Sequence, residues 1–197
     1  MGKFIIYQVL PRLFGNYNTT RKTNGTIEEN GCGKFNDFTK LALSEIKSLG
    51  ITHIWYTGII EHATQTDYTK HGIRKDADVL VKGKAGSPYA IKDYYDVDPD
   101  LAVNVAERMK EFQDLVDSTH ESGLKVIIDF VPNHVARQYH SDAKPEGVKD
   151  LGETDHPEWK FSPFNNFYYL PGEAFSPQFD IADYNENPAK ATGNDQF

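Results

Sequence analysis

The feature that most constrains the fold is an alternation of three strand-like apolar segments with two amphipathic helical segments. The strand-like segments cover residues 4–10, 52–57 and 124–131, and each is a nearly continuous apolar run rich in β-branched and aromatic residues. Strands that are covered on both faces have this pattern. Helical patterns over residues 38–50 and 104–123 lead into the second and third segments. The order β-α-β-α-β, with short turns before each new strand, predicts parallel strands joined by right-handed crossovers.

Both helical segments carry residues that are typical of helix ends. Asn36 is a candidate N-cap of the first helix, and Gly50 fits the position just past its end. Asn104, with Glu107 three residues later, resembles a capping box at the start of the second helix. Gly123 is placed to end that helix.

The chain changes character after His134. Residues 135–197 hold six of the ten prolines and no long helical pattern, so we expect a loop-rich subdomain that leaves the end of the third strand. Residues 61–88 form a smaller polar insertion after the second strand. Residues 1–134 then contain about three βα units, whereas a closed parallel barrel needs eight, so we expect the sequence to be part of a longer chain.

The polar end of the third strand-like segment, LKVIIDFVPNH (124–134), is the first candidate for a site, because ligands of α/β folds bind beyond the carboxyl ends of the strands. Pro132 marks the exit of the strand, because proline cannot donate to a sheet ladder. Asp129 lies where the strand leaves the core, Asn133 offers a carbonyl oxygen suited to a hard cation such as calcium, and His134 offers an imidazole that can donate to a hydroxyl. The same residue types are common in turns, so a capped turn over a packed histidine remains the alternative.

This stretch resembles the first conserved region of the α-amylase family of glycoside hydrolases (family thirteen), in which a helix ending in His-x-x-Gly leads into a strand reading Asp-x-Val-x-Asn-His. The segments IIYQVLPRLF, FTKLALSEIKSLGITHIWYTGI and SPYAIKDYYDVDPDLA resemble, in order, the first strand, the first helix with the second strand, and the segment of the substrate-stacking tyrosine. The resemblance implies the N-terminal part of a (β/α)8 barrel (TIM barrel) over residues 1–134. Residues 135–197 resemble the domain B that leaves such a barrel after its third strand.

The resemblance also implies roles for individual residues. Tyr89 would stack against the sugar at the cleavage point, and His134 would hydrogen-bond a hydroxyl of that sugar. Asp129 would orient an arginine from a later strand. Asn133 resembles the position that supplies a calcium ligand in many relatives, whereas other members of the family lack the ion.

The implied reaction is hydrolysis, or transfer, at α-1,4-glucosidic bonds of starch and maltooligosaccharides with retention of configuration. It needs two carboxyl groups about 5–5.5 Å apart. In this family the two follow the fourth and fifth barrel strands, and we expect both beyond Phe197, so that a 197-residue piece alone is inactive. The aspartates at positions 93, 96, 98 and 100 are interpreted as a solvated loop before a helix, not as catalysts.

Two other classes of function remain as alternatives. A non-catalytic carbohydrate-binding module would use Phe164, Phe167, Tyr168 and Tyr169 as a stacking platform, although these rings equally suit the small core of the loop-rich segment. A nucleotide-binding α/β protein needs a glycine-rich loop directly after a strand, and the glycines of residues 30–33 lie far from the first strand.

The composition of the chain excludes several classes of partner and site. The net charge of −8, without a basic stripe, argues against nucleic acid. The single cysteine excludes an intrachain disulfide and a zinc site of cysteines. No apolar run reaches the length of a membrane span, and no leader pattern follows Met1, so we expect a cytoplasmic protein, or a periplasmic or secreted one whose leader has been removed. An open parallel sheet would leave apolar surface uncovered, and we expect it to promote self-association.

Overall fold

The computed structural model describes residues 2–192, and its centre is a three-stranded parallel sheet with the strand order β1-β2-β5. These strands are β1 (Ile6–Val9), β2 (His53–Tyr56) and β5 (Lys125–Ile128), and they lie within the three segments that the sequence predicts. Residue 1 and residues 193–197, where the two predicted domains begin and end, lie outside the described residues.

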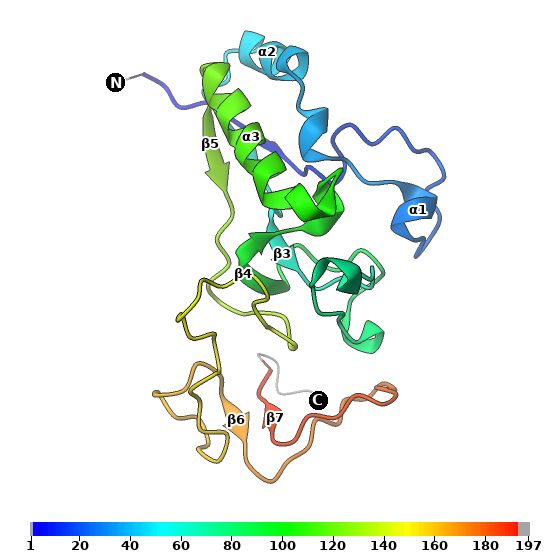
Figure 1. The fold of residues 1–197 in the computed structure, drawn as a ribbon, viewed down its shortest axis with the longest axis vertical. Helices are drawn as coiled ribbons and strands as arrows, with labels where there is room; N and C mark the ends of the chain where they lie inside the picture. Colours follow the sequence, from blue (N-terminus) through cyan, green and yellow to red (C-terminus); the bar gives the residue numbers. More distant parts are fainter. Residues whose placement is uncertain (1, 193–197) are drawn as a thin grey trace.

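Two helices join the three parallel strands as crossover connections (Figure 1). They are α2 (Lys40–Ser48), which leads into β2, and α3 (Arg108–Glu121), which leads into β5. Gly50 and Gly123 follow them with φ angles of 82° and 72°, the left-handed conformation that ends a helix and that glycine adopts without strain. Both predicted helix ends are therefore confirmed. Within residues 2–192 no helix is both long enough and apolar enough to cross a bilayer.

The predicted helix starts are only partly correct. The N-cap of α2 is Thr39, whose Oγ1 accepts a hydrogen bond from the amide of Ala42 at 3.2 Å. Asn36 instead lies inside a separate 3-10 turn, η1 (Phe35–Asp37), which ends before α2 begins. Because η1 and α2 are nearly adjacent in the sequence, both Asn36 and Thr39 stand near the start of the apolar stripe. The prediction chose Asn36, whereas Thr39 is the cap.

At the second helix, Asn104 is a cap, but of the 3-10 turn η5 (Val105–Glu107) that leads into α3. Its side chain accepts from the amide of Ala106 at 3.2 Å. The acid that reaches back to the amide of Asn104 is Glu111, at 2.7 Å, and not Glu107. The 3-10 turn η5 lies between Asn104 and α3, so the acid that bonds back to Asn104 lies seven positions later instead of three. The predicted capping-box spacing is therefore wrong.

A hairpin of β3 (Ile60–His62) and β4 (Ile91–Val97) packs below the parallel sheet. β3 overlaps the polar insertion predicted over residues 61–88, and β4 overlaps the aspartate-rich stretch interpreted as a solvated loop, so neither strand was predicted. Between them the chain forms loops with the short turns η2 (Thr69–His71) and η3 (Asp78–Leu80), and η4 (Pro99–Leu101) follows β4.

The C-terminal part of the described chain is loop-rich, as predicted. Its strands are β6 (Tyr169–Leu170) and β7 (Ala189–Lys190), which pair antiparallel. In Figure 1 this part lies at the end of the molecule opposite α2. The remaining short element, α1 (Ile27–Asn30), belongs to a long loop between β1 and α2.

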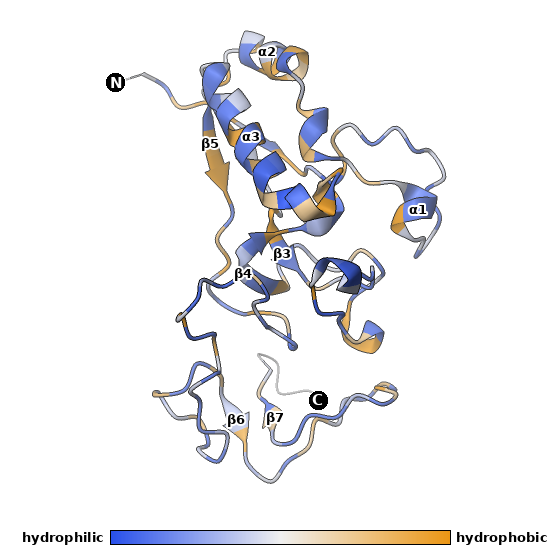
Figure 2. Ribbon diagram, in the orientation of Figure 1, coloured by the Kyte–Doolittle hydropathy of each residue, from blue (hydrophilic) through white to orange (hydrophobic). Residues whose placement is uncertain are grey.

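The main core lies between the parallel sheet and its two helices. Its most buried members include Leu43, Ile54, Tyr56 and Leu115. The other face of the sheet is open: Ile6 of β1 is outside the core and 51% exposed. Figure 2 shows that β5 is largely apolar, and Phe130, which follows this strand, is 73% exposed. The apolar pattern predicted cover on both faces, and residues 2–192 supply it on one face only.

Candidate functional site

An open cavity of about 450 Å³ lies along the exposed face of the parallel sheet and reaches the carboxyl ends of β2 and β5. Its polar and aromatic groups come from Trp55, Tyr89, Asp129 and Phe130, and its aliphatic lining comes from Ile6, Ile127, Ile128 and Val131. The structure therefore brings together two of the predicted substrate-binding residues, Tyr89 and Asp129, which are 40 positions apart in the sequence. This location is the one that parallel α/β folds use for their ligands.

Asp129 is fixed by its neighbour on β2. The indole Nε1 of Trp55 donates a hydrogen bond to Asp129 Oδ1. The second oxygen, Oδ2, is buried and has no hydrogen-bond partner within residues 2–192. Because a buried carboxylate oxygen without a partner is costly, this atom is suited to accept from a cationic donor.

Tyr89 reaches the cavity from the loop that precedes β4, and its side chain is 44% exposed. The loop comes close to the end of β2 because Gly58, at φ 75°, has no side chain. A Cβ at Gly58 would lie 2.7 Å from the Cβ of Pro88, the residue before Tyr89. A half-exposed phenol ring at the rim of a cavity can stack on a ligand while its hydroxyl stays solvated.

His134 and Asn133 do not line this cavity; both are exposed on the loop after β5. The amide nitrogen of Asn133 lies 3.4 Å from Nδ1 of His134. The sugar contact of His134 and the calcium ligation by Asn133 remain predictions. Among residues 2–192, the one group of three acidic, histidine or cysteine side chains close enough to hold a metal is Glu61, Asp93 and Asp96.

The four aspartates that the sequence analysis placed in a solvated loop are all buried, so that interpretation is wrong. Asp93 accepts from the backbone amides of Asp142 and Ala143 at 2.9 and 3.0 Å. Asp96 accepts from the guanidinium of Arg108, with Nε 2.9 Å from both carboxylate oxygens.

The other two aspartates meet a cation from the end of β1. Arg12 pairs with both Asp98 and Asp100, and it is 3.5 Å from the Asp98 carboxylate. The hydroxyl of Tyr68 donates to Asp100 at 2.5 Å. His62 lies 3.6 Å from Asp98 on the other side. Side chains from distant segments take the place of water around these carboxylates. The local density of charge therefore predicted a solvated loop incorrectly.

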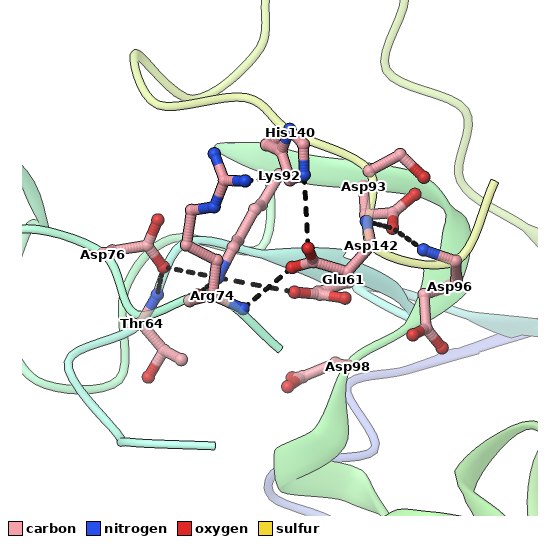
Figure 3. A network of polar contacts seen from close by, with 12 residues as sticks. Glu61, Thr64, Arg74, Asp76, Lys92, Asp93, Asp96, Asp98, His140 and Asp142 are labelled. Atoms are coloured by element: carbon pink, nitrogen blue, oxygen red, sulfur yellow. Dashed lines mark hydrogen bonds and ion pairs between the residues drawn. The ribbon is translucent and has the colours of Figure 1, made fainter. Parts of the chain in front are cut away.

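Glu61 joins this buried group, and the sequence analysis did not single it out. Its side chain lies among the carboxylates of β4 (Figure 3), and ligand oxygens of Glu61, Asp93 and Asp96 lie within 4.8 Å of one another. Burial raises the pKa of Glu61 to about 8, against the opposing effect of Lys92. The hairpin register explains the grouping: Glu61 pairs with Asp93, and register shifts on both sides of Glu61 bulge the chain so that Asp96 can also face it.

The sheet and the cavity define an α/β protein whose ligand site lies at the carboxyl ends of parallel strands. The family model described as "Alpha amylase, catalytic domain" matches residues 8–176. The chain therefore belongs to the α-amylase family, and its fold is the N-terminal portion of the family's (β/α)8 barrel. The predicted resemblance and fold class are confirmed.

The chain is similar to several named proteins. It is 28% identical to an alpha-amylase of Streptomyces lividans over 150 residues, 76% of this chain and 15% of that protein. It is 26% identical to a cyclomaltodextrin glucanotransferase of Geobacillus stearothermophilus over 142 residues, 67% of this chain and 18% of that protein. A solved alpha-amylase from Lactobacillus plantarum aligns with a TM-score of 0.49 and 29% identity, over 81% of this chain and 27% of that one.

A further relative is the amino acid transporter heavy chain SLC3A1 of Mus musculus, 27% identical over 134 residues, 68% of this chain and 14% of that protein. The chain thus spans less than a fifth of the length of these three curated relatives. The relatives include an alpha-amylase and a cyclomaltodextrin glucanotransferase. Because a transporter heavy chain is also among them, membership of the family does not by itself fix an activity.

Proposed function

We propose that this chain forms part of the sugar-binding floor of a retaining glycosidase, or transglycosidase, that acts on α-1,4-linked glucans. The observation that carries the proposal is the shared cavity of Tyr89 and Asp129 at the strand ends. In this proposal the Tyr89 ring stacks on the sugar, and His134 hydrogen-bonds one of its hydroxyls. Residues 1–134 act as the barrel part and residues 135–197 as the domain B part of the protein.

Asp129 serves as a positioning residue in this proposal. Its Oδ1 accepts from Trp55, and its unpartnered Oδ2 suits an arginine of the kind the family resemblance implies. Within residues 2–192 it is the only acid that lines the cavity. A retaining glycosidase needs a pair of catalytic carboxyl groups about 5–5.5 Å from each other, so we propose that these 197 residues alone bind sugar without cleaving it. Calcium at Asn133 belongs to the same proposal.

The experiment is a titration of the chain with maltoheptaose, followed by amide NMR shifts, together with an assay for released sugars. We expect binding without turnover, and loss of binding in Tyr89→Ala. Tyr95→Ala is the matched control, because Tyr95 is equally exposed but does not line the cavity. Cleavage of maltoheptaose that disappears in Asp129→Asn would contradict the proposed division of roles, and binding that survives in Tyr89→Ala would contradict the proposed site.

A second candidate function, a non-catalytic carbohydrate-binding module, is favoured by one specific observation. Phe164 is 85% exposed and Tyr168 is 55% exposed, whereas Tyr169 is buried and packs in the small sheet of β6 and β7. The predicted platform is thus divided between surface and core. Maltoheptaose binding that is lost in Tyr168→Ala and retained in Tyr89→Ala would support this candidate over the first.

A further inference from the structure

The carboxylates of Glu61, Asp93 and Asp96 form a compact buried group away from the sugar cavity. Their ligand oxygens lie within 4.8 Å of one another, and all three side chains are buried. Oxygens that share one cation at 2.3–2.6 Å must lie at most about 5 Å apart, so this spacing suits a single ion. We propose that Glu61, Asp93 and Asp96 bind one hard divalent cation, of the Ca²⁺ or Mn²⁺ type, at the β3–β4 hairpin.

The second observation that points to a ligand is the state of Glu61. Its side chain is 1% exposed, and Oε2 has no hydrogen-bond partner within residues 2–192. Lys92 does not serve this atom: its Nζ lies 3.6 Å from the other oxygen, Oε1, and it also donates to the backbone carbonyl of Arg74. A cation bound to Oε2 would replace the water that this oxygen loses on folding.

Asp93 and Asp96 are held in place by protein donors. Asp93 accepts from the amides of residues 95, 142 and 143, which leaves one of its roughly four acceptor positions open. Asp96 accepts from the amide of Val97 and from the guanidinium of Arg108, so a cation at Asp96 would share its oxygens with these donors. Outer contacts of this kind orient metal ligands in known sites. The site would then join the hairpin, the start of α3 and the segment after β5.

Charge also favours a divalent ion. Lys92 is shared between Glu61 and Asp76, at 3.6 and 3.3 Å (Figure 3). Arg108 pairs with Asp96. Four carboxylates, including Asp93, therefore face two cationic side chains, and two negative charges stay uncompensated when all are ionised. Buried charge without compensation is costly, and one divalent cation cancels it. The competing occupant is a proton on Glu61, which a bound cation must displace.

The test uses the full chain after treatment with EDTA and exchange into metal-free buffer. Calorimetric titration with CaCl₂, and Mn²⁺ binding followed by electron paramagnetic resonance, should each show one ion per chain in Asn133→Ala, which removes the calcium position proposed at Asn133. We expect Glu61→Gln to weaken the affinity at least tenfold. Glu45→Gln, a change at an exposed acid on α2, should leave it unchanged. Asn133→Ala should also leave it unchanged, which separates this site from the calcium position predicted at Asn133.

Three results would overturn the proposal. One is the absence of stoichiometric uptake at millimolar metal, which would mean that a proton alone neutralises Glu61. The second is uptake that survives Glu61→Gln in the Asn133→Ala background, and the third is uptake that is lost in Asn133→Ala alone. In case Glu61→Gln does not fold, Mn²⁺ broadening of amide NMR signals in the unsubstituted chain decides the question: signals of residues 61 and 93 should broaden first, and broadening centred elsewhere refutes the site.

Discussion

The hydroxyl of Tyr68 provides a direct test of the buried aspartates, because it donates to Asp100 at 2.5 Å inside the protein. Asp100 is fully buried, and Arg12 pairs with its other carboxylate oxygen. The change Tyr68→Phe removes one donor from this carboxylate and leaves the ring in place. A hydrogen bond to a charged group contributes about 1.5–3 kcal/mol. We therefore expect Tyr68→Phe to lower the free energy of unfolding by about 2 kcal/mol, roughly a 30-fold change in the folding equilibrium.

The assay is urea unfolding followed by circular dichroism, with the free energy taken from linear extrapolation. Tyr17→Phe is the control, since Tyr17 is 92% exposed and its change should cost less than about 0.5 kcal/mol. In the Asp100→Asn background the acceptor is neutral, so Tyr68→Phe should cost only about 0.5–1.5 kcal/mol. Equal costs for Tyr68→Phe and Tyr17→Phe would show that Asp100 is solvated after all, and would refute the reasoning.

Three further variants test the local structure by the same unfolding assay or by light scattering. Thr39→Ala should lower the free energy of unfolding by about 1 kcal/mol and Asn36→Ala should hardly change it, because only Thr39 caps α2. A larger loss in Asn36→Ala than in Thr39→Ala would show that Asn36 is the N-cap after all. Gly86→Ala should lower the free energy of unfolding several times more than Gly50→Ala. Both glycines have positive φ, but only at Gly86 would the new Cβ meet a backbone oxygen, at 1.8 Å. Similar losses in the two variants would contradict that close approach. If the uncovered sheet face drives self-association, Phe130→Asp should lower the average mass measured by light scattering, and an unchanged mass would place the contact elsewhere.

The parallel sheet was predictable because its signals are local. Apolar runs with β-branched residues mark β1, β2 and β5, and a helical stripe followed by glycine marks each crossover. The hairpin of β3 and β4 was not predictable in the same way. Its strands carry charged residues at buried positions, and its register is irregular, so neither alternation nor an apolar run identifies it.

The residues of the candidate site also differ in whether a local pattern identifies them. Asp129 could be found because it ends an apolar strand, and Tyr89 could be found through the resemblance to the α-amylase family. Glu61 gave no signal, because it stands in a short segment whose burial depends on β4. The hydrogen bond from Trp55 to Asp129 joins residues 74 positions apart, and only the register of β2 against β5 brings them together.

The buried aspartates show what decides whether a run of acids is solvated. Within Asp-Tyr-Tyr-Asp-Val-Asp-Pro-Asp (93–100) the spacing of charges is that of a surface loop, and the run itself contains no cationic residue. Arg12 lies 86 and 88 positions before the two aspartates that it pairs with, and Arg108 comes from the next helix. Each pairing requires the end of β1, the hairpin and α3 to be assembled already. The burial of these acids is therefore a consequence of the fold. Arg12→Ala, which leaves two buried carboxylates without their cation, should lower the free energy of unfolding more than Lys40→Ala, which removes an exposed ion pair with Glu121.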